Sequence, residues 1–293
     1  MRVLHLDTGQ EMRGGQWQVL RLLQGLAAEG VESTLLARRG GTLIHAARGR
    51  GLRAEPIGWR QAAMESRTHD LVHAHDARSH TMAAIASRAP LVVARRVAFP
   101  IRSRWKYGRA RQYIAVSEYV KGILIEGGVA AEKIRVIADG VPLLPVSTGE
   151  RVVTPDDGGD LMKGTPLALE AGKRAGVAME VSRNLEEDLR SAGILVYVTR
   201  SEGLGSGVLL AMSAGVAVVA SNVGGLREII RSGENGILVE NETAAVCDAI
   251  RKLASDRVLA RRLGAAARQT VMERFTVERM ARETIEVYRQ VIS

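Results

Sequence analysis

Short apolar runs alternate with amphipathic stretches along the first half of the chain. Residues 16–29 are of helical length and place Trp17, Leu20, Leu23 and Leu26 at regular intervals of three, and residues 77–88 and 118–127 show a similar pattern. Strands buried on both faces read as nearly continuous apolar runs, so this alternation predicts a parallel sheet covered by helices on both sides. The apolar runs are VLHLDT (3–8), STLLAR (33–38), LVHAH (71–75), LVVARR (91–96), YIAVS (113–117) and IRVIADG (134–140).

Residues 142–163 interrupt this alternation. They read PLLPVSTGERVVTPDDGGDLMK, which is rich in proline, glycine, serine and acidic residues and has no sustained period. This composition predicts a domain connection followed by a mobile loop. The PDDGGD stretch (155–160) lacks the Asp-x-Asp spacing of a metal site for a diphosphate, so it too indicates a loop.

A second region of strands and helices follows the connection. It contains ILVYV (194–198), a helix over 206–214, VAVVA (216–220), a helix near 226–232, GILV (236–239) and helices from Thr243 onwards. We predict an α/β fold of two Rossmann-like domains: an N-terminal domain over 1–145, a C-terminal domain over 146–274, and a closing helix over 275–293 that packs back towards the N-terminal domain. Only about three strands are evident in the second domain, which is therefore expected to be reduced or incompletely represented.

Composition narrows the class of protein. The single cysteine, Cys247, excludes a disulfide framework and a thiolate zinc site, and it favours a reduced, cytoplasmic compartment. The apolar runs are far shorter than the ~20 residues that a membrane-spanning helix needs. The formal net charge of +9 implies an anionic partner, which could be nucleic acid, acidic lipid or a phosphorylated small molecule.

SEGLGSGVLLAM (201–212) holds the strongest candidate site. A strand ends near Thr199, glycines alternate with small residues, and a helix begins. The amides of Leu204, Gly205, Ser206 and Gly207 would be free donors at a helix N-terminus, which suits a diphosphate. Glu202, just before them, could accept hydrogen bonds from sugar hydroxyls. The alternative is a tight turn that needs glycine for its conformation alone.

This segment strongly resembles the signature of the group 1 glycosyltransferases of the GT-B fold. The stretch SEGLGSGVLLAMSAGVAVVASNVGGLREII follows the family pattern Glu-Gly-aromatic/Leu-Gly, Leu-Glu-Ala-Met, Gly-x-Pro-Val-Val-Ala, Gly-Gly and Glu. Other segments resemble further family motifs in the same order along the chain. They are RGGQWQ (13–18), DLVHAHDARSH (70–80), YIAVSEYVK (113–121), VIADGV (136–141), MKG (162–164) and FTVERMARETIEVYRQV (275–291).

The resemblance implies a retaining, metal-independent transfer of a sugar from a nucleotide-diphosphate sugar to a glycan or lipid-linked acceptor, without a cofactor. It implies catalytic roles for Glu202, His75 and Lys163. The expected donor-binding residues are Lys163, Glu202, Gly203, Leu204, Gly205, Ser206, Gly207, Leu210, Asp139 and Gly140. The expected acceptor-side residues are Gly14, Gly15, His73, His75, Asp76, Arg78, Arg95 and Arg96. No residue is expected to bind a metal.

The chain also departs from the family pattern. The family carries a second glutamate eight positions after the first, where it holds the ribose hydroxyls, but the residue eight positions after Glu202 is Leu210. Leucine cannot accept a hydrogen bond. The arginine that usually precedes Lys-Gly is missing from PDDGGDLM, so Lys163 would face the phosphates alone. These changes motivate an alternative, a weakly active or inactive binding module.

The histidines cluster in one short segment, since four of the six fall within residues 69–80. His73 and His75 lie two residues apart at a strand end and so point to the same face. They could be hydrogen-bonded structural residues, cleft residues that bind substrate, or metal ligands; no HExxH helix supports the last option. Gly14 and Gly15 could form either a plain strand-to-helix turn or a ligand-contacting loop.

Residues 95–113, RRVAFPIRSRWKYGRARQY, form a basic run with Trp105, Tyr107 and Tyr113 among the cations. Three interpretations are open: a solvated helix with extended arginine side chains, a surface that contacts anionic lipid or an anionic acceptor, and a site for single-stranded nucleic acid. We expect the second to involve peripheral contact with the inner face of a membrane, and we do not expect nucleic acid to be the partner.

Overall fold

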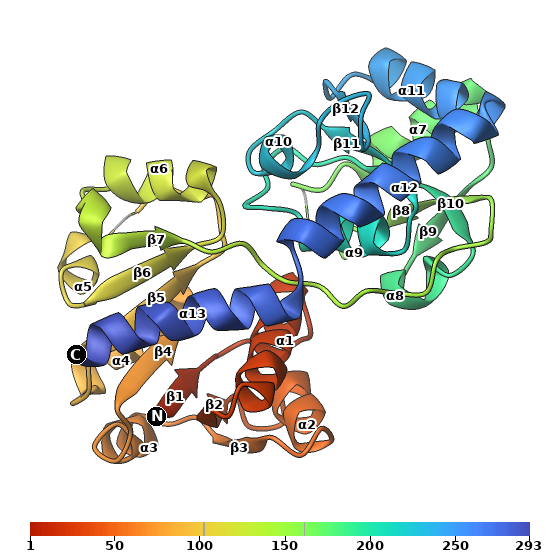
Figure 1. The fold of residues 1–293 in the computed structure, drawn as a ribbon. Helices are drawn as coiled ribbons and strands as arrows, with labels where there is room; N and C mark the ends of the chain where they lie inside the picture. The colour runs from red at the N-terminus through yellow and green to blue at the C-terminus, as the bar shows by residue number, and fades with distance from the viewer. Residues whose placement is uncertain (102, 161) are drawn as a thin grey trace. The chain divides into compact units, whose positions relative to one another are not determined.

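The computed structural model describes residues 1–101, 103–160 and 162–293 (Figure 1). The chain forms two compact units. Unit 1 contains Met1–Gly140 together with Val277–Ser293, and unit 2 contains Val141–Thr276. The chain enters and leaves unit 2 side by side, because the Val141 amide donates to the Phe275 carbonyl at 2.9 Å.

Unit 1 is built on a parallel sheet of seven strands in the order β3-β2-β1-β4-β5-β6-β7. The strands are β1 (Arg2–Leu6), β2 (Glu32–Ala37), β3 (Arg53–Pro56), β4 (Leu71–Ala74), β5 (Leu91–Arg95), β6 (Gln112–Ala115) and β7 (Ile134–Val136). The helices are α1 (Gly14–Ala28), α2 (Thr42–Arg48), α3 (Trp59–Glu65), α4 (Ala77–Ala86), α5 (Arg104–Tyr107), α6 (Glu118–Glu126) and α13 (Val277–Ile292).

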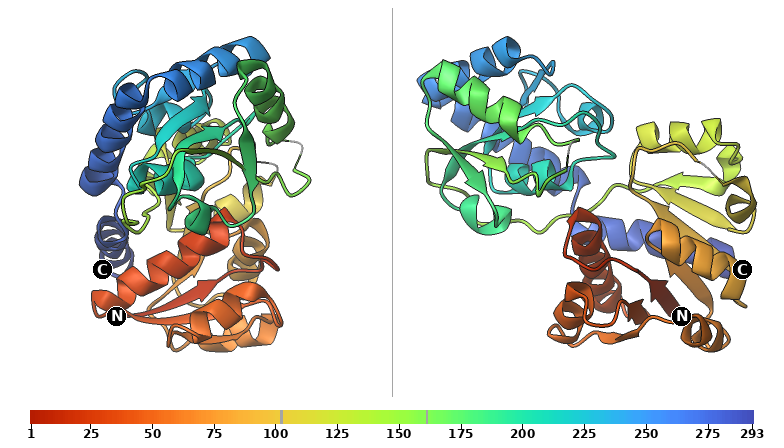
Figure 2. Two further views of the ribbon diagram at one scale, coloured as in Figure 1. Left: turned by 90° about the vertical axis from the view of Figure 1, so that its right-hand side faces the viewer. Right: turned by 180° about the vertical axis from the view of Figure 1, so that it is seen from behind.

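Helices cover both faces of this sheet. Helix α13 lies along one face next to α1, and α4 crosses the opposite face, as the views from the front and from behind show (Figures 1 and 2). The apolar stripe of α1 joins α13 and the strands in one core cluster through Leu22, Leu26, Ile285 and Tyr288. Amphipathic helices on a sheet of apolar strands bury both surfaces together, which stabilises the unit.

Unit 2 has a parallel sheet of five strands in the order β12-β11-β10-β8-β9. The strands are β8 (Arg151–Pro155), β9 (Met179–Ser182), β10 (Ala192–Tyr197), β11 (Ala217–Ser221) and β12 (Ile237–Val239). The helices are α7 (Thr165–Ala175), α8 (Leu185–Asp188), α9 (Ser206–Ser213), α10 (Leu226–Ile229), α11 (Thr243–Ser255) and α12 (Arg257–Arg274). The main core cluster joins α7, α11 and the strands, and Cys247 is one of its buried residues.

The structure corrects one part of the sequence prediction. We expected residues 142–163 to be a connection and a loop, but Arg151–Pro155 is strand β8, which pairs with β9 and β10 on its two sides. The strand is difficult to recognise in the sequence because polar residues flank its short apolar core, Val152 and Val153, which is buried. The predicted α/β class with two parallel sheets is confirmed, and the smaller sheet of unit 2 agrees with the expected reduction of that domain.

Candidate active site

The loop between β10 and α9 has a conformation that only glycine allows. Gly205 lies just before α9 with φ +104°, in the left-handed region that side chains avoid. A Cβ atom on Gly205 would also lie 2.6 Å from Leu226 Cδ2, and one on Gly225 would lie 2.1 Å from the Gly203 carbonyl oxygen. The glycines therefore hold residues 203–205 tightly against the start of α10.

This loop leaves a row of amides open at the start of α9. No residue that the structure describes accepts a hydrogen bond from the amides of Leu204, Gly205, Ser206 or Gly207. The first amides of a helix carry partial positive charge and point along the helix axis, so they attract anions. The predicted amides are thus available to an anion, and their role at a diphosphate stays a prediction.

Lys163 lies near the same loop. A short antiparallel bridge pairs it with Thr199, and the Gly164 amide donates to the Val198 carbonyl at 2.9 Å. Its ammonium group donates to the Tyr197 hydroxyl at 2.8 Å and to Glu202 Oε2 at 3.1 Å. The structure thus brings two of the three predicted catalytic residues, Lys163 and Glu202, into direct contact.

Tyr197 is a member of this cluster that the sequence did not reveal. Burial, with the Glu202 carboxylate beside it, raises the pKa of the Tyr197 hydroxyl well above its usual range. The hydroxyl therefore stays protonated and donates a 2.6 Å hydrogen bond to Glu202 Oε2. The other carboxylate oxygen, Oε1, accepts from the Gly203 amide at 3.1 Å. Glu202 is fixed by three donors, and the Lys163 side chain stays 32% exposed.

Leu210 lies one helical turn inside α9 and is 6% exposed. The neighbouring residues of the helix, from Val208 to Ser213, are buried as well. The side chain of Leu210 therefore contributes to packing in unit 2.

In unit 1, Asp76 and Asp7 organise the loops at the carboxyl ends of β4 and β1. Asp76 caps α4 by accepting from the Arg78 and Ser79 amides, and it also accepts from Thr8. Asp7 is buried and accepts from Gly9 and Gln16, while burial and the nearby Asp76 raise the pKa of its carboxyl group. Both carboxylates are thus engaged in holding the loop that leads to α1.

Of the other acceptor-side candidates at this edge, Gly14 and Gly15 are the first two residues of α1. A Cβ atom on Gly15 would meet nothing within 4 Å, so crowding does not require glycine there. Arg78, at the start of α4, is exposed.

Three buried histidines lie side by side above the same sheet. His5 and His73 are directly opposite each other on β1 and β4, and His75 follows β4. His5 Nδ1 lies 3.0 Å from His75 Nε2, and His73 Nδ1 lies 2.6 Å from the Tyr288 hydroxyl on α13. Sequence analysis found His73 and His75 but missed His5, because strand pairing alone brings the third ring into the group.

Arg96 extends this cluster. Its Nε donates to Asp139 at 3.0 Å, and its NH1 group lies 3.4 Å from His75 Nδ1. A guanidinium can only donate, so His75 Nδ1 accepts, His75 Nε2 carries the proton, and His5 Nδ1 accepts in turn. Gly140, whose amide donates to Met280 Sδ, is buried beside this network. Asp139 and Gly140, predicted on the donor side, thus lie in unit 1 with Arg96 and His75.

The histidine rings are neutral at physiological pH. Burial, with additional repulsion from His69 and Arg96, lowers the pKa of His5 to about 3. Burial also lowers the pKa of His73 and His75 well below the usual range, and neighbouring histidines and Arg96 add to the shift.

Within the part of the chain that the structure describes, His5, His73 and His75 form the one group of side chains that could hold a metal ion. One nitrogen of each lies within 4.8 Å of the other two. The adjacent guanidinium of Arg96 opposes a cation there, because it already donates to His75 and repels positive charge.

Arg95 turns to the other side of the loop. It donates to the Tyr107 hydroxyl at 3.2 Å and to the Phe99 carbonyl, and so orders the chain after β5. Arg102 of the predicted basic run lies outside the described residues.

Two family models match the chain in succession. Residues 12–143 match Glycosyltransferase Family 4, and residues 160–270 match Glycosyl transferases group 1. Among solved structures, HepE from Anabaena in complex with UDP and glucose superposes with a TM-score of 0.86. It is 18% identical, and the match covers 99% of this chain and 100% of that one.

Curated relatives match over a shorter stretch. An alpha-maltose-1-phosphate synthase from Mycolicibacterium smegmatis is 36% identical over 117 residues, which are 38% of this chain and 30% of that protein. An N-acetyl-alpha-D-glucosaminyl L-malate synthase from Bacillus anthracis is 32% identical over 110 residues, or 37% of this chain and 29% of that protein. The matched part therefore spans under a third of the length of either relative.

The two Rossmann-like units define the GT-B fold, as the close superposition on HepE shows. The two successive family matches, over residues 12–143 and 160–270, support a group 1 glycosyltransferase.

The burial of Leu210 predicts how a glutamate would behave there. Leu210→Glu should lower the free energy of unfolding of unit 2 by several kcal/mol, because a buried carboxylate without a partner is costly. Thermal unfolding and nucleotide titration of the same variant test this. Leu210→Met, which conserves volume, is the control and should stay within about 1.5 kcal/mol of the parent. An unchanged melting temperature with tighter nucleotide binding would instead put this position at the ribose.

The histidine cluster predicts an acid sensitivity of unit 1. In the unfolded chain His5 takes up a proton below about pH 6.5, whereas in the folded chain it does so only near pH 3. The free energy of unfolding should therefore fall as the pH is lowered through this window, by up to about 1.4 kcal/mol per pH unit for each such histidine.

Urea unfolding at pH 7, 6 and 5 measures this slope. His5→Gln should show a shallower dependence on pH than the parent, whatever its absolute stability. The matched control is His45→Gln, at an exposed histidine of α2 in the same unit, and it should keep the parental slope. Equal slopes for the parent and His5→Gln would contradict the prediction.

Proposed function

We propose that this protein transfers a sugar from a nucleotide-diphosphate sugar to an acceptor, with retention of anomeric configuration and without a metal ion. One observation carries the proposal: Lys163, paired with Glu202, lies beside four open amides at the start of α9. The same kind of donor is named in the solved structures of Anabaena HepE with UDP-glucose, which share the fold.

The chemistry needs negative charge to be stabilised on the departing diphosphate while the anomeric carbon becomes cationic. Fixed dipoles aimed at developing charge are the strongest general means of doing this. In the proposed complex the amides of residues 204–207 and the Lys163 ammonium hold the diphosphate, so no metal is needed there. The Glu202 carboxylate, fixed by Tyr197 and Gly203, accepts hydrogen bonds from the sugar hydroxyls.

The acceptor side of the proposal lies in unit 1. Arg96, Asp139 and His75 form one network, and Asp76 and Asp7 order the loop before Gly14. His73 is 1% exposed and bound to Tyr288, so its part is to support His75 rather than to contact the acceptor. Arginines in this position suit an anionic group on the acceptor.

A glycolipid or a cell-envelope polysaccharide is the proposed acceptor class. Within the basic run, Val97 and Phe99 are exposed in the loop after β5, and Trp105 is exposed on α5. Apolar and cationic side chains together favour peripheral contact with anionic head groups. Of the helices that the structure describes, none is both long and apolar enough to cross a membrane.

A second candidate function is a binding module that keeps the donor site without turnover. The burial of Leu210 favours it, because the second family glutamate would have held the ribose. Turnover with a panel of nucleotide sugars and lipid-linked acceptors separates the two candidates. The same assay with excess EDTA tests metal independence, and NMR of the product identifies its anomer. Activity lost in EDTA and restored by manganese, or an inverted product, would contradict the proposed mechanism.

Replacement of Lys163 tests the donor site directly. Lys163→Ala should weaken nucleoside diphosphate binding by about 1–3 kcal/mol, because a charged hydrogen bond is lost and Glu202 is left without its counter-charge. Isothermal titration with UDP, GDP and ADP measures the change. Lys173→Ala, on the exposed side of α7, is the matched control and should bind as the parent does. Equal affinities for the two variants would exclude Lys163 from the site.

A further inference from the structure

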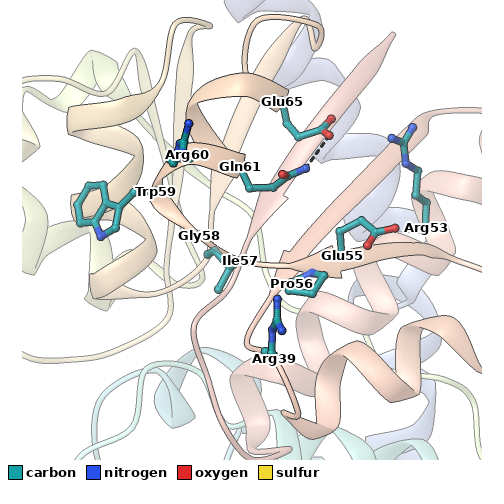
Figure 3. Close-up of a pocket in the computed structure, with 10 residues that line it drawn as sticks. All are labelled: Arg39, Arg53, Glu55, Pro56, Ile57, Gly58, Trp59, Arg60, Gln61 and Glu65. Carbon is teal, nitrogen blue, oxygen red and sulfur yellow. Dashed lines mark hydrogen bonds between the residues drawn. The ribbon is translucent and has the colours of Figure 1, made fainter.

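A hollow of about 670 Å³ opens in unit 1 beside strands β2 and β3 (Figure 3). Arg39 reaches it from the loop after β2, and Ile57 and Gly58 line it just after β3. Trp59 and Arg60 come from the first turn of α3. The lining also includes Arg53, the first residue of β3, so the hollow lies along this edge strand of the sheet. Its size is in the usual range for a small-molecule site of ~300–1,000 Å³.

The charges around the hollow are unbalanced. Arg39, Arg53 and Arg60 have no acceptor for their guanidinium groups among the residues that the structure describes. Of the two carboxylates in the lining, Glu55 pairs with Arg48 at 3.3 Å, and Glu65 accepts from the neutral amide of Gln61 at 2.9 Å. Three arginines therefore stand against two carboxylates in the lining. Three unpaired cations around one concave surface attract an anion, and the planar guanidinium group matches carboxylate and phosphate oxygens.

Trp59 adds an apolar surface at the same place. Its side chain is 51% exposed and lies on one side of the hollow in Figure 3. An indole face covers the apolar face of a ring, while the polar groups around it take up hydroxyls or charges. Cations and an exposed aromatic ring together favour a sugar that carries a negative group over a bare ion.

The loop that carries Arg39 packs against the loop between β1 and α1. The Thr42 amide donates to the Gln10 carbonyl at 3.1 Å, which fixes the Arg39 loop against it. A Cβ atom on Gly41 would lie 3.3 Å from the carbonyl oxygens of both Gly9 and Gln10, so the two loops are in close contact. Gly14 and Gly15, which we place on the acceptor side, follow directly along the chain.

We propose that this hollow binds an anionic sugar residue, one that carries a carboxylate or a phosphate, within an extended acceptor. The inference rests on the proposed transferase function, and it names the acceptor class and a further binding site for it. The arginines around the hollow supply positive charge for the anionic group, and Trp59, at its outer margin in Figure 3, offers an aromatic face to the sugar ring. The site recognises a residue away from the reacting hydroxyl, because none of these residues belongs to the Arg96 network.

Gly58 offers a way to fill the hollow without disturbing the fold. Its backbone is extended, with φ −160°, and an added Cβ would meet nothing within 4 Å. Gly58→Leu should therefore occupy the hollow and leave the melting temperature near the parental value. Arg60→Ala removes one exposed cation, and Arg67→Ala is the matched control, since Arg67 is an exposed arginine just after α3 that does not line the hollow.

Binding is measured with glucuronate, glucose 6-phosphate, glucose and inorganic phosphate, from the chemical shift of the Trp59 indole N–H. We expect glucuronate and glucose 6-phosphate to bind, and glucose and phosphate each to bind about tenfold more weakly, which is the effect of losing one charged hydrogen bond or its equivalent. Gly58→Leu and Arg60→Ala should weaken the binding of the two anionic sugars by a similar factor, and Arg67→Ala should not.

Three results would contradict the proposed site for an anionic sugar. Phosphate that binds as well as glucose 6-phosphate would show an anion site without sugar recognition. Undiminished binding in Gly58→Leu would place the ligand elsewhere, and preferential binding of an oligonucleotide would replace the sugar by nucleic acid. Nucleoside diphosphate titration of the same variants depends on unit 2 alone, so a failure of this inference is distinguishable from a failure of the proposed function.

Discussion

The ion pair between Lys163 and Glu202 organises the proposed donor site. The two residues come from segments 39 positions apart, and the buried Tyr197 hydroxyl joins them by accepting from the lysine and donating to the glutamate. The pair is partly exposed, so its own contribution to stability is small. Its importance is positional, since it holds a cation next to the open amides of α9. In the proposed complex the diphosphate would gain the lysine as a partner, and Tyr197 and Gly203 would still donate to the carboxylate.

In unit 1, the polar rings of His5, His73 and His75 are buried against a sheet of apolar strands. Arg96 sets the protonation of this cluster. Its guanidinium group can only donate hydrogen bonds, so Nδ1 of His75 accepts and Nε2 carries the proton. Because Nε2 of His75 carries the proton, it donates to Nδ1 of His5 at 3.0 Å. On the far side, Tyr288 meets His73 and ties α13 to the strands. The closing helix is thus held by a polar contact as well as by its apolar stripe, and the same network fixes the groups proposed to face the acceptor.

The spacing of apolar residues and the glycines of tight turns predict the long helices and strands and the glycine-rich loop before α9. These features depend on residues that are close together in the chain. Strand β3 reads RAEP and β8 reads RVVTP, and neither has the length or alternation that distinguishes a strand from a loop. The partners of the site are non-local. His5 becomes a neighbour of His73 through strand pairing, Tyr288 arrives from the end of the chain, and Tyr197 joins Lys163 only when the loop after β8 is in place. Leu210 was recognised as a departure from the family, but its burial could be seen only in the fold.

If the proposed donor site is correct, the burial of Leu210 determines which of its contacts supply affinity. In a site with two glutamates, recognition is shared between the sugar end and the ribose end of the nucleotide. In the proposed site the amides of residues 204–207, Lys163 and Glu202 serve the diphosphate and the sugar, while Leu210, the position expected at the ribose, is apolar and packed inside unit 2. Charge-assisted contacts to phosphate oxygens do not depend on the base or on the ribose hydroxyls. Discrimination among nucleotides then falls to the loops around the base, and an extended, charged acceptor can contribute the specificity that the ribose contact no longer supplies.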